Sequence, residues 1–218
     1  MDNTNWNPGI QAMFPLPVFI DKASGKEFES IDTELNDLAT KIEFSQRPGW
    51  NPDTHMLSPD PFNTNIIKDY DCKNFLEYLE KSINRYVSPI IRVPFDYCLN
   101  ASWLTKTLKG KYAAEHHHGT ADISGVYYVD TNGKDGGLKF DNIHSHACAN
   151  PLIALLPGET PMPLETGVII LWPGYLKHKT DPNTTDHERI SLSFNIQFPR
   201  AGFCRSKIRT SFNGIQPL

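Results

Sequence analysis

Hydrophobic positions divide the chain into a helical first part and a strand-rich second part. Apolar side chains recur every three or four places in residues 31–44 and again in residues 65–86, and this spacing predicts two amphipathic helices. Ahead of them, residues 14–20 combine apolar side chains with prolines, which predicts an edge strand because proline lacks the N–H needed inside a sheet. The Pro-, Asn- and Asp-rich residues 46–65 are predicted to be a loop.

After residue 94, short apolar runs alternate with turn residues, as is typical of β-structure. The predicted strands cover residues 98–108, 113–118, 123–130, 138–140, 152–155, 168–172, 190–198 and 207–212. Residues 132–137 (Asn-Gly-Lys-Asp-Gly-Gly) have the composition of a hairpin turn.

Many short strands behind two helices indicate an α+β chain, mostly β and mostly antiparallel, that forms a jelly roll with N-terminal packing helices. The length of 218 residues fits one domain. We expect an N-terminal strand and helices in residues 1–95, a jelly-roll core in residues 96–200 and a C-terminal tail in residues 201–218.

Composition excludes several classes of protein as expectations for this chain. The net charge is −4 and no long block of Lys or Arg occurs, so a dedicated nucleic-acid binder is not expected. The four cysteines are widely spaced, which predicts neither a thiolate zinc knuckle nor a disulfide framework. No apolar stretch approaches the roughly 20 residues needed to span a bilayer, and the first residues do not read as a signal peptide. A cytoplasmic protein is the expectation.

The histidine triplet at residues 116–118 is the strongest candidate for a functional site. His116 and His118 are separated by one residue and share a face of an extended chain, while His117 points away. A third imidazole, His178, follows the apolar strand 168–172 and a turn, and can close a three-ligand site if the sheet folds back on itself. A solvated loop is the alternative reading of the triplet.

The other histidines are weaker candidates. His144 and His146 also have a spacing that allows chelation, but their surroundings read as a loop. His55 and His187 stand alone among polar residues and are expected to be solvated.

The third ligand of the candidate site could be an imidazole or a carboxylate. Non-haem iron(II) sites normally take two histidines and one carboxylate on one face. Here His118 stands where the carboxylate is usual. Glu115 has the wrong strand parity relative to His116, and Asp122 lies beyond Gly119, where the chain is expected to turn. We favour three histidines, with Glu115 or Asp122 as the alternatives.

The strand 190–198 carries a polar face that begins just before it, at Arg189. Arg189, Ser191, Ser193 and Asn195 alternate with apolar residues and so point to the same side. Such a face usually meets solvent. A guanidinium followed by two hydroxyls is equally suited to hold a carboxylate by paired hydrogen bonds, and its position after the histidines favours that reading.

These segments resemble a family of small proteins assigned as iron(II)- and 2-oxoglutarate-dependent oxygenases, with a double-stranded β-helix like that of prolyl hydroxylases. The family pattern is His-x-His before Ser-Gly-Val-Tyr-Tyr, then a Gly-x-Leu-x-Phe turn, Pro-x-x-x-x-His and Arg-Ile-Ser-x-Ser-Phe-Asn. The match covers roughly residues 98–198 and comprises His-His-His-Gly-Thr-Ala-Asp-Ile-Ser-Gly-Val-Tyr-Tyr at 116–128, Gly-Leu-Lys-Phe at 137–140, Pro173 to His178, and Arg-Ile-Ser-Leu-Ser-Phe-Asn at 189–195. Gly119 replaces a family proline.

The resemblance implies a set of roles. His116, His118 and His178 would bind Fe(II), and the far carboxylate of the cosubstrate 2-oxoglutarate would pair with Arg189. A further hydrogen bond to the cosubstrate falls on Tyr128 and on Ser191 or Ser193. O2 and an unidentified small-molecule or peptidyl substrate complete the reaction, which would couple oxidative decarboxylation to C–H oxidation. Related halogenases vacate the carboxylate position for chloride, so His118 favours hydroxylation.

Two other classes compete with this hypothesis. One is a three-histidine dioxygenase of the cupin kind that uses no oxo acid, and the other is a non-catalytic jelly-roll module that holds a metal. A functional Arg189 distinguishes the first hypothesis from the cupin-type dioxygenase, and iron binding that is lost in His116→Ala and His178→Ala would count against the non-catalytic module. Residues 46–65, residues 141–163 and the tail after Pro199 are candidate lids, and the N-terminal edge strand would permit a homodimer.

Overall fold

The computed structural model describes residues 16–61, 63–91, 95–142, 157–199 and 208–209. Its elements, in chain order, are β1 (Phe19–Lys22), α1 (Gly25–Lys41), β2 (Met56–Leu57), α2 (Ile66–Asp69), α3 (Lys73–Val87), β3 (Asp96–Thr107), β4 (Ile123–Asp130), β5 (Leu138–Asp141), β6 (Glu159–Pro161), β7 (Val168–Pro173), β8 (His178–Thr180), β9 (Arg189–Gln197) and β10 (Ile208–Arg209).

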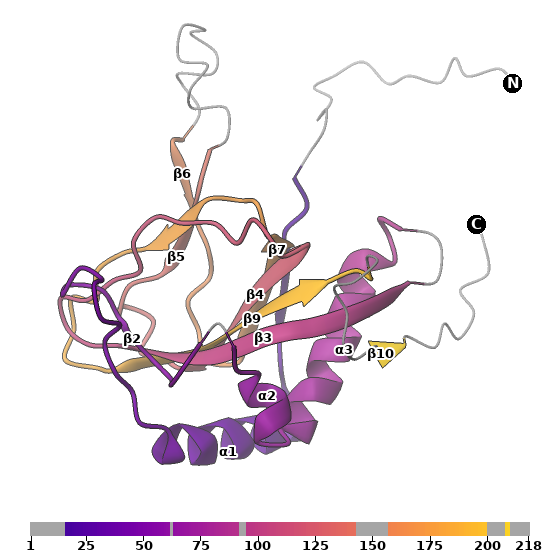
Figure 1. Ribbon diagram of the computed structural model, residues 1–218, viewed down its shortest axis with the longest axis horizontal. Coiled ribbons are helices and arrows are strands. Elements are labelled where there is room, and N and C mark those ends of the chain that lie inside the picture. Colours follow the sequence, from indigo (N-terminus) through magenta and orange to yellow (C-terminus); the bar gives the residue numbers. More distant parts are fainter. Residues whose placement is uncertain (1–15, 62, 92–94, 143–156, 200–207, 210–218) are drawn as a thin grey trace, which may run out of the picture.

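The strands form two antiparallel sheets that face each other. The larger sheet has the order β1-β7-β4-β9-β3-β10, with β2 paired to β3, and the smaller has the order β6-β5-β8. Helices α1 and α3 lie on one side of the larger sheet, and β5 and β6 lie on the other (Figure 1). Both faces of the larger sheet are therefore covered.

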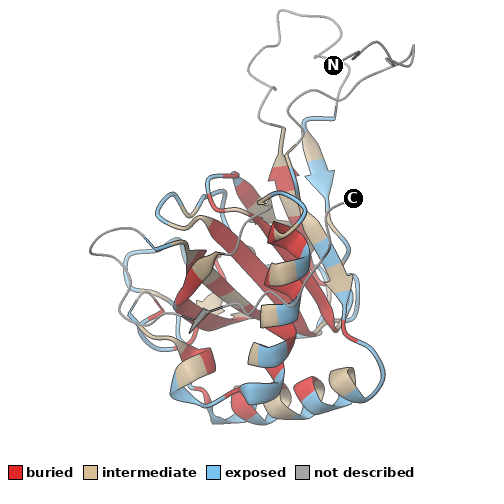
Figure 2. Ribbon diagram, turned by 90° about the vertical axis from the view of Figure 1, so that its right-hand side faces the viewer, coloured by how far each residue is buried: buried red, intermediate tan, exposed pale blue. Residues whose placement is uncertain are grey.

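The main hydrophobic core lies between the helices and the face of the larger sheet that they cover, which we call its outer face. Helix α1 contributes Ile31 and Leu35, which are fully buried and belong to one cluster with Phe75 of α3 and Tyr127 and Phe194 of the sheet. In Figure 2 the central strands are largely red, whereas the helices show separate red stretches among tan and pale blue ones. The two amphipathic helices thus exist because their apolar stripes cover this sheet.

The inner face of the larger sheet packs against the smaller sheet. Tyr128 and Trp172 lie in a second cluster with Leu138 and Phe140 of β5. Strand residues alternate between the two clusters, so that Tyr127 faces the helices and Tyr128 faces the smaller sheet. The polar residues of β9 that alternate with Leu192 and Phe194 consequently point between the sheets and not to solvent.

The predicted helices are present with different bounds. Helix α1 begins at Gly25, ahead of the predicted residue 31, and ends at Lys41. The predicted helix 65–86 is two helices, because Asp71 adopts a φ of 54° between α2 and α3. The carboxylate of Glu34 in α1 accepts hydrogen bonds from the backbone N–H groups of Asn74 and Phe75, which caps α3 and ties it to α1.

The strand predictions were less complete. Residues 113–118 do not form a strand, and His116 makes an isolated bridge to His178 instead. The predicted strand 152–155 and most of 207–212 lie outside the described residues, and only β10 falls within them. Strands β2, β6 and β8 are short additions that the pattern did not predict.

Two further observations concern the expectations drawn from hydropathy and from the cysteines. No helix in the described part of the chain is long and apolar enough to cross a membrane. Cys98 is disulfide-bonded, with a partner outside the described residues, whereas the spacing of the cysteines predicted no disulfide framework.

Candidate active site

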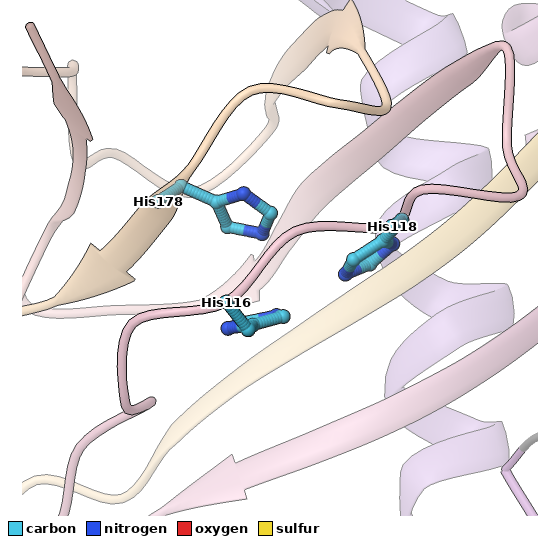
Figure 3. A group of neighbouring side chains, drawn as sticks. All are labelled: His116, His118 and His178. Carbon is cyan, nitrogen blue, oxygen red and sulfur yellow. The ribbon is translucent and has the colours of Figure 1, made fainter. Parts of the chain in front are cut away.

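Three histidines from two distant parts of the chain meet between the sheets. His116 and His118 lie on the connection from β3 to β4, and His178 begins β8. Their rings point toward one another (Figure 3), and one ligand atom from each lies within 4.8 Å of the others. Within the described residues this is the cluster of His, Cys, Asp and Glu side chains that could hold a metal ion.

Backbone hydrogen bonds hold the three histidines in place. The N–H of His116 donates to the carbonyl of His178 at 3.0 Å, and the N–H of His178 donates back at 2.9 Å. The N–H of His118 donates to the carbonyl of Gly174 in the turn after β7, at 2.8 Å. The turn between β7 and β8 therefore fixes the relative positions of all three residues.

Each imidazole uses its Nδ1 for a hydrogen bond within the protein. His116 Nδ1 lies 2.7 Å from the carbonyl oxygen of Ala114, and His178 Nδ1 lies 2.8 Å from that of Leu176. His118 Nδ1 lies 2.6 Å from Oδ1 of Asn195. Because these oxygens only accept, each Nδ1 carries the proton and each Nε2 keeps a free lone pair. Three free Nε2 atoms in one cluster are a donor set that suits a divalent metal.

Loss of hydration favours the neutral form of these imidazoles, although His116 is the most exposed of the three. This loss lowers the pKa of His178 to about 3 and the pKa of His118 to about 4, and it also lowers the pKa of His116. A neutral imidazole is the form that binds a metal ion. Protons therefore do not compete for these nitrogens near neutral pH.

The alternative carboxylates do not join the cluster. Glu115 is exposed and pairs with Lys177 at 3.1 Å, and Asp122 accepts a hydrogen bond from the backbone N–H of Phe198 at 2.8 Å. His117 is exposed and is not a member of the cluster. His144 and His146 lie outside the described residues.

Arg189 provides a buried positive charge next to the histidines. Arg189 is only 3% exposed. Its guanidinium donates hydrogen bonds to the carbonyl of Asp135 at 2.9 Å and to the hydroxyl of Thr107 at 3.1 Å. Its Nε has no hydrogen-bond partner among the described residues. A buried guanidinium with an unused N–H is costly unless an anion joins it, so the site is suited to a carboxylate ligand.

Tyr128 lies beside this guanidinium and is also buried. Its hydroxyl oxygen accepts a hydrogen bond from the N–H of Leu138 at 3.3 Å, which leaves its own O–H to donate. Burial raises the pKa of Tyr128, so the hydroxyl stays protonated. The indole N–H of Trp172 is a further buried donor that has no partner in the described part of the chain.

One cavity connects the two groups. Its lining includes the three histidines, Tyr128, Trp172 and Arg189, and both Ser191 and Ser193. Arg189 is the one permanently charged side chain among the described residues that line this cavity, and no carboxylate lines it. The polar face of β9 thus meets a positively charged cavity and not solvent, which makes an anionic ligand the expected occupant.

Two residues were misjudged from the sequence. His55 was expected to be solvated, but it is 8% exposed and lines the cavity. Its backbone N–H and its Nδ1 both lie near the carbonyl of Tyr112, at 3.1 and 3.2 Å. His187 is partly buried, with Nε2 at 3.3 Å from a carboxylate oxygen of Asp130. The loop 46–65 carries no sequence pattern that would have placed His55 here.

Part of the chain matches a known protein family. Residues 101–195 match a family model described as "Putative 2OG-Fe(II) oxygenase". This segment contains the three histidines, Tyr128, Arg189 and both serines, whereas His55 lies before it. No curated protein matches the chain.

Solved structures share the fold at low sequence identity. The α-ketoglutarate-dependent epimerase SnoN from nogalamycin biosynthesis is 14% identical, with a TM-score of 0.58 over 93% of this chain and 88% of SnoN. HygX from Streptomyces hygroscopicus, with nickel, 2-oxoglutarate and hygromycin B bound, is 13% identical, with a TM-score of 0.53 over 84% of this chain and 83% of HygX. An oxidoreductase of the 2OG-Fe(II) oxygenase family from Burkholderia pseudomallei is 10% identical, with a TM-score of 0.55 over 81% of this chain and 92% of its own. These likenesses confirm the double-stranded β-helix.

Proposed function

We propose, from the match of residues 101–195 to the 2OG-Fe(II) oxygenase model, that this chain is an iron(II)- and 2-oxoglutarate-dependent hydroxylase whose iron(II) is held by His116, His118 and His178. The observation that carries this proposal is the meeting of three imidazoles, each with Nδ1 engaged and Nε2 free. We further propose that 2-oxoglutarate binds in the adjoining cavity with its far carboxylate against Arg189.

The residues of the cavity have distinct tasks in this proposal. Arg189 orients the cosubstrate by hydrogen bonds to the far carboxylate, and Tyr128 adds a donated O–H. Ser191 and Ser193 offer hydroxyls on the same strand face. Iron(II) with 2-oxoglutarate and O2 supplies the redox chemistry, in which 2-oxoglutarate, O2 and a substrate C–H yield succinate, CO2 and a C–OH product. The apolar walls from β4, β5 and β7 keep water away from the reacting groups.

His118 favours hydroxylation over halogenation. A halogenase needs the position of the third protein ligand for a halide, and the imidazole of His118 occupies that place in the cluster. Incubation with 2-oxoglutarate and chloride is therefore expected to give no chlorinated product with any substrate that is hydroxylated.

The substrate is proposed to be a small organic molecule. HygX holds hygromycin B, and SnoN has been solved with nogalamycin RO, so related folds of this size accept such ligands. A peptidyl substrate is the alternative. A single domain over residues 1–218, a cytoplasmic location and a homodimer stay predictions from the sequence.

The decisive experiment is anaerobic addition of Fe(II) and then 2-oxoglutarate to metal-free protein, followed by visible spectroscopy. We expect a weak charge-transfer band that requires both additions and disappears in His116→Ala. The adjacent His117→Ala is the matched control and should keep the band, because His117 is exposed and outside the cluster.

Two outcomes would redirect the proposal. Iron binding without any band, and without an effect of 2-oxoglutarate, would favour a three-histidine dioxygenase that uses no oxo acid. Absence of metal binding in the wild-type protein would leave the non-catalytic module.

A further inference from the structure

Among the described residues, Asn195 is the one whose side chain hydrogen-bonds to a histidine of the cluster. Its Oδ1 lies 2.6 Å from Nδ1 of His118, whereas His116 and His178 use the backbone carbonyls of Ala114 and Leu176. A carbonyl of the main chain can only accept, so it fixes the proton on Nδ1 whatever the side chains do. The position of the proton on His118 is not fixed in this way, because a side-chain amide carries both an acceptor and a donor.

The orientation of the Asn195 amide decides which nitrogen of His118 is free. With Oδ1 toward the imidazole, Nδ1 carries the proton and Nε2 presents a lone pair to the cluster. With the amide turned over, its NH2 would donate to Nδ1, and Nε2 would carry the proton instead. An Nε2–H cannot bind a metal ion. A single amide therefore switches the third imidazole between a ligand and a non-ligand.

A second contact holds the amide from the neighbouring strand. The hydroxyl of Ser124 donates to the same Oδ1 at 2.9 Å. Ser124 is fully buried, and it is the direct partner of Asn195 in the register of β4 with β9. Oδ1 thus lies within hydrogen-bond distance of two groups, Nδ1 of His118 and the hydroxyl of Ser124, and it can accept from both.

We propose that Asn195, held by Ser124, is the positioning residue that makes His118 a metal ligand. The inference rests on the proposed function, since it deepens the role of the same cluster. Asn195 supplies the acceptor that holds the proton of a ligating histidine on the nitrogen away from the metal. It does so without adding a negative charge to the cluster. Ser124 acts through Asn195 and does not touch the cluster.

Co(II) binding to the metal-free protein tests this proposal without any turnover. We expect Asn195→Leu, which removes the acceptor at similar size, to lower the Co(II) affinity by about 10–100-fold, the usual effect of removing the hydrogen-bond partner of a ligating histidine. Asn195→Asp keeps an acceptor oxygen and should bind Co(II) within a few-fold of wild type. Ser124→Ala should fall between the two. Asn36→Leu, which removes a hydrogen-bonded amide from α1, is the control and should bind as wild type does.

A second readout reports the tautomer itself. In metal-free protein with 15N-labelled histidine, His118 should show a protonated Nδ1 and an unprotonated Nε2 in wild type and in Asn195→Asp. Asn195→Leu should shift the His118 signals toward a mixture of the two tautomers, while the signals of His116 and His178 stay in place. A general loss of packing would move all three, so this pattern separates positioning from a merely structural role.

The outcomes separate this inference from the proposed function. Wild-type affinity for Co(II) in Asn195→Leu, with an unchanged His118 tautomer, would overturn the inference and leave the metal site intact. Failure of the wild-type protein to bind Co(II) would overturn the proposed function, and the inference with it. If Asn195→Leu does not fold, Ser124→Ala carries the test, since unchanged Co(II) affinity in that variant would overturn the part assigned to Ser124.

Discussion

His116 and His178 exchange a pair of backbone hydrogen bonds, at 3.0 and 2.9 Å, and their imidazole centroids lie 4.3 Å apart. One residue lies on the connection after β3 and the other begins β8, so the bridge joins a loop to the smaller sheet. Two of the three candidate ligands are therefore placed by main-chain pairing. Their separation does not depend on the packing of long, flexible side chains.

Metal binding is expected to stabilise the folded chain. A ligand present at about 100 times its dissociation constant adds about 2.7 kcal/mol to the free energy of unfolding. Ni(II), which avoids oxidation during the measurement, should produce that gain in wild type, and EDTA should reverse it. His178→Ala should lose the gain, while His117→Ala should keep it. Thermal denaturation with and without Ni(II) measures both, and an equal gain in His178→Ala would contradict the assignment of this ligand.

Arg189 should govern affinity for 2-oxoglutarate and leave the metal site alone. Removing one partner of a buried charge pair costs about 2–5 kcal/mol of binding free energy, and we expect a loss of that size in Arg189→Gln. Isothermal titration of 2-oxoglutarate into Ni(II)-loaded protein gives the value. Arg85→Gln removes an exposed arginine that pairs with Asp21 far from the cavity, and it should bind 2-oxoglutarate as wild type does. Equal affinities in the two variants would argue against a carboxylate at Arg189.

His55 should make the metal-free protein sensitive to acid. Burial lowers its pKa from 6.5 to about 4, so as the pH falls the unfolded chain takes up a proton before the folded chain does. The free energy of unfolding therefore falls from about pH 6.5 downward and levels off below about pH 4. The contribution of His55 between pH 7.5 and pH 4.5 is roughly 2–3 kcal/mol.

Urea denaturation at these two pH values tests that expectation. His55→Phe should lose less stability on acidification than wild type, by the amount assigned to His55. His117→Phe, at an exposed position, should lose as much as wild type does. A pH dependence in His55→Phe identical to that of wild type would show that another group is responsible.

Gly174 should tolerate no side chain. A Cβ there would lie 2.3 Å from the carbonyl oxygen of Ala121 and 2.9 Å from that of His118, and both are backbone atoms. We expect Gly174→Ala to cost about 1–3 kcal/mol of stability, as overpacking does, and to weaken Ni(II) binding because His118 must move. Gly158→Ala meets nothing within 4 Å and should be neutral in both measurements. Chemical denaturation and Ni(II) titration of the pair provide the comparison.

Periodicity alone predicted much of the fold. The helical spacing of Ile31 and Leu35 and the alternation in β9 depend only on neighbouring residues, and both are confirmed. The break at Asp71 was missed because a positive φ at a non-glycine residue has no strong local signature. Residues 113–118 were misread as a strand because a single bridge and a strand share the same extended conformation.

The residues of the candidate site also divide into those with a local sequence signal and those whose contacts depend on the tertiary structure. His116 and His118 were proposed together because they are separated by one residue, and Arg189 was proposed because it begins the alternating polar face of β9. His55 and Asn195 could not be assigned their contacts, since these depend on which strands and loops lie opposite. Asn195 was recognised as part of the polar face of β9, yet its bond to His118 requires the register of β9 with β4. Long-range register is a tertiary property, and no local pattern encodes it.

The bridge between His116 and His178 also links metal retention to local opening of the smaller sheet. When β8 separates from the connection after β3, both amide protons become exchangeable and two candidate ligands move apart in the same event. A bound metal would oppose that opening. The amides of these two residues should therefore exchange with deuterium much more slowly in the metal-loaded protein, so that hydrogen exchange at two positions reports how firmly the ion is held.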